Sequence, residues 1–135
     1  LYDVAMVKDN HVAAAGGSVG TAVARIRDRF PGVAIQVEAD TLAQAMAALD
    51  AGADFLLLDN MSTSLLARVV AAVRAREPQT GRVELEATGN LTLERAREVA
   101  ATGVDYLSVG ALTHSSPILD LALDLDPSGG PTGRP

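Results

Sequence analysis

Five short apolar segments, each followed by a longer stretch with helical spacing, constrain the fold of this chain more than any other feature. An apolar run of four or five residues is too short for a stable helix but suits a strand that is covered on both faces. The predicted strands are 4–7, 33–37, 55–58, 83–87 and 106–109. Between them, apolar residues recur every three or four positions, which indicates amphipathic helices packed on a sheet. The alternation predicts parallel βα units.

An internal similarity supports these units. Segment 51–59 resembles segment 102–110 in its pattern of small, acidic and apolar residues, and two βα units lie between the two segments. A helix–loop–strand joint that recurs along one chain is typical of a (β/α) barrel, in which every unit meets the sheet in the same way. We therefore predict an α/β fold with an incomplete parallel barrel-like sheet of about five of the usual eight units. A doubly wound sheet is the alternative.

The ends of the chain differ from its centre. Residues 1–125 are predicted to form one barrel portion, whereas 126–135 consist mainly of Pro, Gly, Ser and Thr, a composition that predicts disorder. Segment 118–125 alternates Leu with Asp and suits either an edge strand or a short helix. The first residue is Leu1 rather than Met, so we expect this chain to be the later part of a longer polypeptide.

Charge and composition exclude several classes of function. A net charge of −6 and a pI near 4.7 argue against a nucleic-acid partner, because phosphate backbones require a basic face. The chain has no cysteine, which excludes disulfides and thiolate metal sites and is compatible with a reducing cytoplasm. Its apolar runs are shorter than the ~20 residues of a membrane span, so no membrane partner is expected.

Polar residues follow the end of every predicted strand. Parallel strands of a barrel place these ends on one rim, where substrates bind in enzymes of this architecture. The polar sets are Lys8, Asp9, Asn10 and His11; Glu38 and Asp40; Asp59 and Asn60; Thr88, Gly89 and Asn90; and Gly110 with Ala111. We predict that these five segments converge on one pocket.

Two of the carboxylates stand out. Glu38 and Asp59 each end a strongly apolar run, where a charge is costly unless it has a partner or a ligand. Together with a lysine they are suited to Mg²⁺ with a polyphosphate, or to ribose hydroxyls. By contrast, Asp40, Asp54 and Asp105 are interpreted as solvated turn or cap residues.

Two glycine-containing loops are candidates for phosphate binding. Thr88, Gly89 and Asn90 precede a predicted helix capped near Thr92, and Gly110 with Ala111 lies on the neighbouring loop. Either loop alone is weak evidence, because glycines at such positions usually serve only tight turns. The two loops together make phosphate binding as good an explanation as tight turns. The glycine-rich stretch 16–20 lacks the ending of a Walker loop, and the two histidines of the chain cannot by themselves form a zinc site.

Five motifs in series resemble the quinolinate phosphoribosyltransferase family. They are Lys-Asp-Asn-His at 8–11, Val-Glu at 37–38, Leu-Leu-Asp-Asn-Met at 57–61, Leu-Glu-Ala-Thr-Gly-Asn at 85–90, and the block at 104–115. The resemblance runs from Leu1 to about residue 125, and 103–115 is its most specific part. It implies an incomplete α/β barrel and an enzyme that joins quinolinate to phosphoribosyl pyrophosphate, releasing CO₂ and pyrophosphate to form nicotinate mononucleotide for NAD synthesis.

The resemblance also implies roles for particular residues. Lys8 would contact the anionic substrates, and Glu38 and Asp59 would bind the ribose hydroxyls directly or through Mg²⁺. These three would be the catalytic residues. The 5-phosphate would be held by Thr88, Gly89, Asn90, Val109, Gly110 and Ala111, with His114 beside that pocket. The resemblance further implies a homodimer or higher homo-oligomer in the intact protein.

One departure from the family pattern affects the functional prediction. The resemblance implies an amino-terminal domain and basic Arg-Lys-Thr and His-Arg segments just before the Leu-Tyr-Asp at 1–3, and this sequence contains none of them. Because those segments would bind quinolinate, we expect negligible turnover from these 135 residues alone. Two alternatives stay open: a non-catalytic barrel remnant that serves in assembly, and a relative of the molybdenum-transport type.

Overall fold

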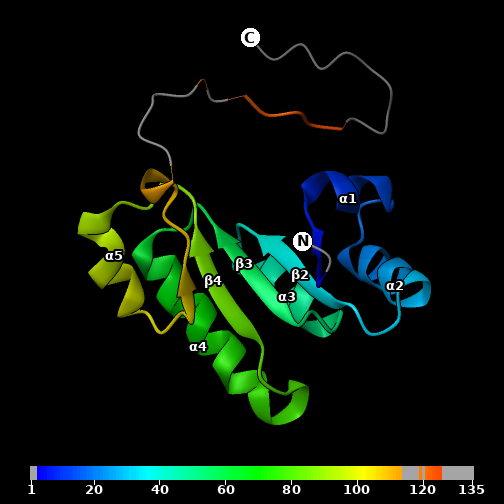
Figure 1. Cartoon of the computed structure of the whole chain (residues 1–135). Helices are drawn as coiled ribbons and strands as arrows, with labels where there is room; N and C mark the ends of the chain where they lie inside the picture. The colour runs from blue at the N-terminus through cyan, green and yellow to red at the C-terminus, as the bar shows by residue number, and fades with distance from the viewer. Residues whose placement is uncertain (1–2, 114–118, 120, 126–135) are drawn as a thin grey trace.

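The computed structural model describes residues 3–113, 119 and 121–125 of the chain (Figure 1). Its strands are β1 (Val4–Val7), β2 (Ala34–Ala39), β3 (Phe55–Asp59), β4 (Glu84–Thr88) and β5 (Tyr106–Leu107). Its helices are α1 (Asp9–Ala14), α2 (Val19–Arg29), α3 (Leu42–Asp50), α4 (Thr63–Thr80) and α5 (Leu93–Ala100), followed by a 3₁₀ turn at Gly110–Leu112. All five predicted strands are therefore present, and each strand end lies within two residues of its predicted position.

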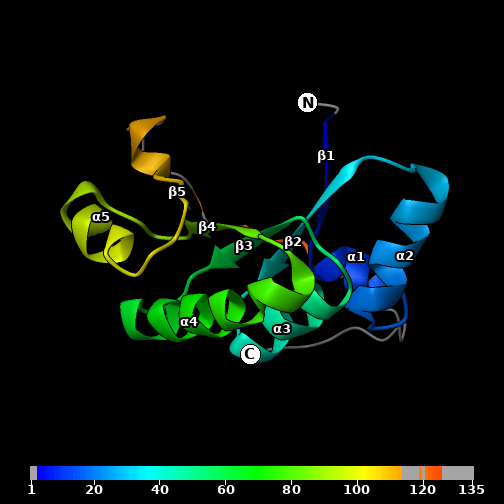
Figure 2. The ribbon, with the colours of Figure 1, turned by 90° about the horizontal axis from the view of Figure 1, so that it is seen from below.

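The five strands form one parallel sheet in the order β1-β2-β3-β4-β5. The sheet is curved and open, and the helices lie along its convex side (Figure 2). A doubly wound sheet reverses its strand order and carries helices on both faces, so that alternative is wrong. The arrangement is that of an incomplete barrel, as predicted.

The two faces of the sheet differ in burial. The face toward the helices carries the core, where Ile35, Leu56 and Leu85 have no solvent exposure. The concave face is open: Val4, Met6 and Tyr106 are 44%, 41% and 52% exposed. Since side chains alternate between faces along a strand, neighbouring residues of one strand belong to environments of very different polarity.

The helices begin where the sequence predicts. The side chains of Ser18, Thr41 and Ser62 accept backbone N–H bonds at the first turns of α2, α3 and α4. Thr41 and Gln44 form a capping box. Thr92 stands at the N-cap of α5 but makes no capping bond with its side chain. Among the described residues, no helix is both long and apolar enough to cross a membrane.

Two segments differ from expectation. The polar residues after β1 begin a short helix, α1, rather than a loop. Residues 119 and 121–125 belong to neither a helix nor a strand, and 118 and 120 lie outside the described residues. Part of this segment is held by Asn10, whose Nδ2 donates to the Leu123 carbonyl at 2.5 Å and whose Oδ1 accepts from the Leu125 N–H at 2.6 Å. The predicted disordered tail, 126–135, also lies outside the described residues.

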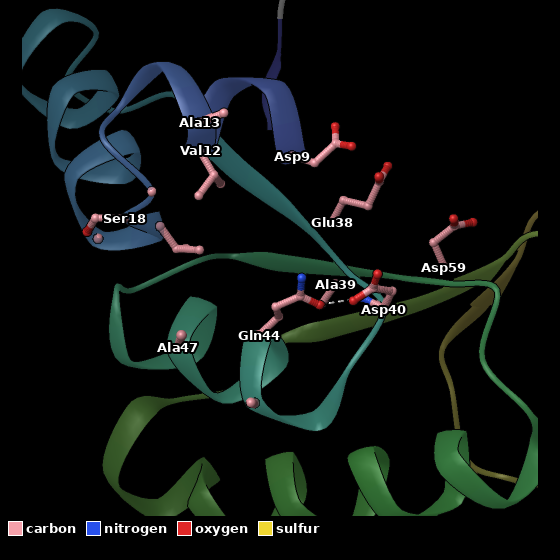
Figure 3. Close-up of a pocket in the computed structure, with 14 residues that line it drawn as sticks. Asp9, Val12, Ala13, Ser18, Glu38, Ala39, Asp40, Gln44, Ala47 and Asp59 are labelled. Carbon is pink, nitrogen blue, oxygen red and sulfur yellow. Dashed lines mark hydrogen bonds between the residues drawn. The ribbon is translucent and has the colours of Figure 1, made fainter. Parts of the chain in front are cut away.

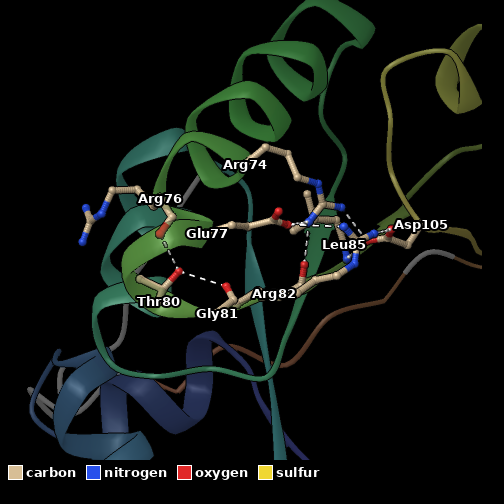
Figure 4. Close-up of polar contacts among 9 residues, drawn as sticks. Arg74, Arg76, Glu77, Thr80, Gly81, Arg82, Leu85 and Asp105 are labelled. Carbon is tan, nitrogen blue, oxygen red and sulfur yellow. Dashed lines mark hydrogen bonds and ion pairs between the residues drawn. The ribbon is translucent and has the colours of Figure 1, made fainter.

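The interpretation of Asp105 as a solvated turn residue is wrong, because its side chain is only 18% exposed and is paired with arginine. The Asp54 side chain is 42% exposed, as expected of a solvated residue, but it also forms an ion pair. At the amino-terminal end of the sheet, Asp105 Oδ2 accepts from Arg74 Nη2 at 2.6 Å and from the Leu85 N–H at 2.8 Å, while Arg74 Nη1 donates to the Val83 carbonyl at 2.8 Å (Figure 4). The same arrangement recurs two units earlier. Asp54 Oδ2 accepts from Arg27 Nη2 at 2.7 Å and from the Ile35 N–H at 2.8 Å, and Arg27 Nη1 donates to the Val33 carbonyl at 3.0 Å.

We call these two arrangements the base clamps. Each joins a helix, the strand that follows it and the loop before the next strand through a charge-assisted hydrogen bond. They explain why segments 51–59 and 102–110 resemble each other: both contain the aspartate of a clamp. Asp40, in contrast, is exposed, as expected of a turn residue.

Candidate active site

The candidate site lies at the carboxyl-terminal ends of the strands, opposite the base clamps. Glu38 on β2 pairs in register with Leu57 on β3, so Asp59, two residues further along β3, projects from the same face. Lys8 directly follows β1, and its Nζ lies 2.9 Å from Glu38 Oε2. Figure 3 shows Glu38 and Asp59 pointing to the same side of the sheet. The structure thus brings together all three residues predicted to be catalytic.

The carboxylates affect each other's protonation. Burial raises the pKa of Asp59, and the neighbouring negative charge of Glu38 raises it further, while Lys8 opposes both effects. A hydrogen bond to Glu38 is the main reason why the pKa of Lys8 is raised. A carboxyl group with a raised pKa beside a cation in a half-buried site is typical of functional sites. Here two carboxylates share one lysine, which leaves an excess of negative charge for a cation or hydroxyl groups.

Gly89 packs directly against this pair. It has φ of +82°, and a Cβ placed on it would lie 2.6 Å from the Asn60 backbone nitrogen and 2.6 Å from Asp59 Oδ1. No side chain fits in that space, and L residues rarely adopt that backbone conformation. The glycine is therefore required by the close approach of its loop to the end of β3, which places the predicted phosphate loop beside Asp59.

Hydrogen bonds hold the loop after β3 against the loop after β4. The Asn60 N–H donates to the Thr88 carbonyl at 3.1 Å, and Asn90 Nδ2 donates to Asn60 Oδ1 at 2.9 Å. Both asparagines adopt positive φ, +52° and +48°, which Asn tolerates better than most residues. Within the described part of the chain, the N–H groups of Gly89 and Asn90 have no protein acceptor. They are thus available for an anion, as the phosphate prediction requires.

The second predicted phosphate loop follows β5. The Ser108 N–H donates to the Ala87 carbonyl at 2.9 Å, which keeps this strand end beside that of β4. Val109 is the N-cap of the 3₁₀ turn that contains Gly110 and Ala111, and the N–H groups at such a start have no partner within the turn. His114, predicted to lie beside the pocket, is outside the described residues.

A cavity of about 840 Å³ opens beside Glu38 and Asp59 (Figure 3). It extends between α1, the start of α2 and α3, and its polar lining includes Asp9, Ser18 and Asp40. The loops at 88–90 and 109–111 do not line it. Glu38 and Asp59 therefore stand between this cavity and the glycine loop at 89, rather than at the bottom of one enclosed pocket.

His11 has a structural task. Its Nδ1 accepts the Lys8 N–H at 3.0 Å and completes the first turn of α1. Among the described residues, no group of three or more His, Cys, Asp or Glu side chains could hold a metal ion.

Sequence reasoning missed one polar cluster on the open face of the sheet. Glu86 on β4 accepts a bond from Gln36 Nε2 at 2.8 Å and another from the Ser108 hydroxyl. Gln36, 8% exposed, is the one buried polar side chain among the described residues. The available signal was the alternation along 84–88, where Glu84, Glu86 and Thr88 share a face.

The curved sheet, the paired carboxylates and the glycine loop define an α/β-barrel domain whose rim carries acidic side chains beside backbone N–H groups without a protein acceptor among the described residues. The chain belongs to the family described as quinolinate phosphoribosyl transferase, C-terminal domain, whose model matches residues 1–124.

Curated relatives carry names consistent with this family. The nicotinate-nucleotide pyrophosphorylase [carboxylating] of Mycobacterium leprae is 46% identical over 125 residues, which cover 93% of this chain and 43% of the relative. The enzyme of the same name from Rattus norvegicus is 39% identical over 131 residues, which cover 96% of this chain and 42% of the relative. The chain thus spans less than half the length of these relatives.

Solved structures agree in fold. The nicotinate-nucleotide pyrophosphorylase from Francisella tularensis superposes with a TM-score of 0.74 at 34% identity, covering 84% of this chain and 38% of that one. A thiamine phosphate pyrophosphorylase from Pyrococcus furiosus, at 22% identity and a TM-score of 0.56, covers 77% of this chain and 55% of that one and shares the fold alone.

Proposed function

We propose that the protein containing this chain transfers the phosphoribosyl group of phosphoribosyl pyrophosphate to quinolinate, releasing pyrophosphate and CO₂ and forming nicotinate mononucleotide for NAD synthesis. One observation carries the proposal: the Lys8–Glu38 ion pair and Asp59 adjoin a glycine loop that packs against Asp59 at Gly89 and has N–H groups without a protein acceptor in the described part of the chain. The names of the curated relatives support the same activity.

The carboxylates stabilise the sugar in this reaction. The bond between C1 of the ribose and the pyrophosphate oxygen breaks, and C1 gains positive character before the pyridine nitrogen bonds to it. Glu38 and Asp59 bind the ribose hydroxyls and stabilise that charge, while Lys8 offsets the negative charge of the anionic substrates. Once the nitrogen is alkylated, the ring accepts the electron pair left by the departing CO₂, and the ring carbon then takes a proton from solvent.

The two loops bind the 5-phosphate. The N–H groups of Gly89 and Asn90 precede α5, whose amino-terminal end adds a favourable dipole for an anion. Gly110 and Ala111 contribute from the neighbouring loop, together with Thr88 and Val109. His114 is proposed to lie beside this pocket. The protein thus holds the sugar between carboxylates at C1 and backbone amides at C5.

The donor set fits Mg²⁺ when the substrate is present. Mg²⁺ usually binds one or two carboxylates together with substrate phosphates and water rather than an all-protein cage, and Glu38 with Asp59 is such a pair. When bound, the ion would supply positive charge to neutralise the leaving pyrophosphate.

Calorimetric titration with phosphoribosyl pyrophosphate and Mg²⁺ tests the site. We expect the wild-type protein to release heat that is lost in Asp59→Ala, whereas Asp50→Ala, which removes a carboxylate on the outer surface paired with Arg76, retains it. Equal heats from wild type and Asp59→Ala would contradict the proposed site. For the 135-residue chain alone we expect no production of nicotinate mononucleotide in a steady-state assay.

A second candidate function follows from the open sheet. The concave face exposes Val4, Met6 and Tyr106, and β1 and β5 are its edge strands, so the chain has surface suited to assembly. A homo-oligomer in the cytoplasm is the state we propose for the intact enzyme. Sedimentation of the chain, combined with an activity assay, tests its role in assembly. If the chain is a stable monomer with full turnover, it does not need other segments for activity.

A further inference from the structure

Glu86 lies on the floor of the candidate site. It shares a register row with Glu38 and Leu57, and Thr88, the next residue on the same face of β4, pairs with Asp59. Its side chain is therefore one row below the rim, on the open face, and is not among the residues assigned to the substrates above. Glu86 makes no ion pair with any described residue.

Both oxygens of Glu86 are hydrogen-bonded across the sheet. Oε2 accepts from Gln36 Nε2 on β2 at 2.8 Å, and Oε1 accepts from the hydroxyl of Ser108 just after β5. The cluster Gln36–Glu86–Ser108, which we call the floor bridge, thus spans from β2 to the end of β5 across the intervening β3. A charged carboxylate among half-buried apolar side chains is costly without such partners.

The partners of Glu86 connect the two halves of the site. Gln36 lies two residues before Glu38 on the same face of β2, and Ser108 lies two residues before Gly110. The strand before Gly110 is short: β5 contains only Tyr106–Leu107, with two register pairs to β4. The backbone ladder therefore constrains the loop at 109–111 only weakly. The Ser108–Glu86 bond adds a second constraint on this loop.

We propose that Glu86 is a positioning residue that, through Gln36 and Ser108, holds the phosphate-binding loop at 109–111 in register with Glu38 and Asp59. This rests on the proposed function, because it concerns the distance between the sugar and phosphate ends of one substrate. The carboxylate of Glu86 does not contact the reacting atoms.

Four variants separate positioning from charge. Glu86→Ala removes both bonds, and Ser108→Ala removes only the bond to the loop. Glu86→Gln keeps two hydrogen-bonding atoms: its carbonyl accepts from Ser108 and its amide donates to a rotated Gln36 side chain. Glu98→Ala is the control, because it also removes a glutamate carboxylate, but from the exposed surface of α5.

The first measurement is hydrogen exchange of the amides at 106–112 in the full chain. We expect exchange about tenfold faster in Glu86→Ala and Ser108→Ala, with Glu86→Gln and Glu98→Ala close to wild type. Unchanged exchange in Glu86→Ala would overturn the proposal without affecting the proposed function.

The second measurement is the dissociation constant of phosphoribosyl pyrophosphate with Mg²⁺, with the thermal midpoint recorded for each variant. We expect about tenfold weaker binding in Glu86→Ala and Ser108→Ala, and near wild-type binding in Glu86→Gln. If wild type binds and Asp59→Ala does not, but Glu86→Ala binds normally, only the positioning role fails. If Glu86→Gln binds as weakly as Glu86→Ala, the charge rather than the bridge matters, and the proposal is wrong. Absence of binding by wild type would refute the proposed function and the positioning role together.

Discussion

The two ends of the sheet use carboxylates in opposite ways. At the amino-terminal end, burial would raise the pKa of Asp105, but the Leu85 N–H and Arg74 lower it more, and the net pKa lies below its usual value. At the carboxyl-terminal end, burial and Glu38 raise the pKa of Asp59. A carboxylate whose charge is favoured in the folded state stabilises the fold, whereas one whose charge is disfavoured lowers the stability of the fold. The comparison indicates that the base holds the sheet, and it supports the proposal that the rim serves a ligand.

The largest expected effect comes from removing the rim carboxylate. In the intact enzyme, Asp59→Ala should lower kcat/KM by about 10³-fold, since stabilisation of a developing charge is commonly worth about 4 kcal/mol. Its thermal midpoint should stay within a few degrees of wild type. The measurement is steady-state formation of nicotinate mononucleotide beside a thermal scan. A variant with wild-type turnover would break the assignment of the rim to function.

The next effect belongs to the base. Asp105→Asn should destabilise the fold by about 3 kcal/mol, because the largely buried Arg74 loses one of its two carboxylate partners and keeps only Glu77. Asp54→Asn should cost only about 1 kcal/mol, because the Asp54 side chain is 42% exposed and solvent screens its ion pair. Urea unfolding of both variants tests this order. Equal losses would show that exposure does not distinguish the two clamps.

A smaller effect is expected where the two loops of the rim meet. Gly89→Ala should cost about 2 kcal/mol of stability, because the added Cβ would collide with Asn60 and Asp59 and the residue must keep positive φ. It should also weaken binding of phosphoribosyl pyrophosphate. Gly32→Ala is the control, since Gly32 has φ of +89° but open space around its Cβ position. If both variants lose the same stability, the close approach has no cost of its own.

The smallest effect is a difference in pH dependence. Asp59 has a raised pKa in the folded state, so its charge destabilises the fold at neutral pH, and Asp59→Asn should be more stable than wild type by about 0.5 kcal/mol. This gain should disappear as the pH falls through the raised pKa. For Asp105 the sign is reversed: its contribution is present above the unfolded pKa and is lost as the pH falls through the lowered folded pKa. Thermal midpoints measured from neutral to acidic pH check both trends.

The sequence predicted the sheet and the rim because both follow from local patterns. Apolar runs mark strands, and parallel strands place whatever follows them, here Glu38 and Asp59, at one end. The base clamps and the floor bridge were not predicted. They join side chains that are 22 to 50 positions apart, such as Glu86 with Ser108 and Gln36 with Glu86, and no periodicity reports on such pairs. Helix α1 was missed because six residues are too few to show a helical period.

The base clamps also divide the sheet into two stapled groups, α2 with β2 and β3, and α4 with β4 and β5. The seam between these groups runs between β3 and β4. No base clamp crosses it in the described part of the chain, and it is joined by backbone pairing and by the Gln36–Glu86 and Asn90–Asn60 bonds. Asp59 and Gly89 face each other across that seam. A sugar phosphate held by both would fasten one group to the other, so occupancy should strengthen the sheet along a boundary that the clamps leave uncrossed.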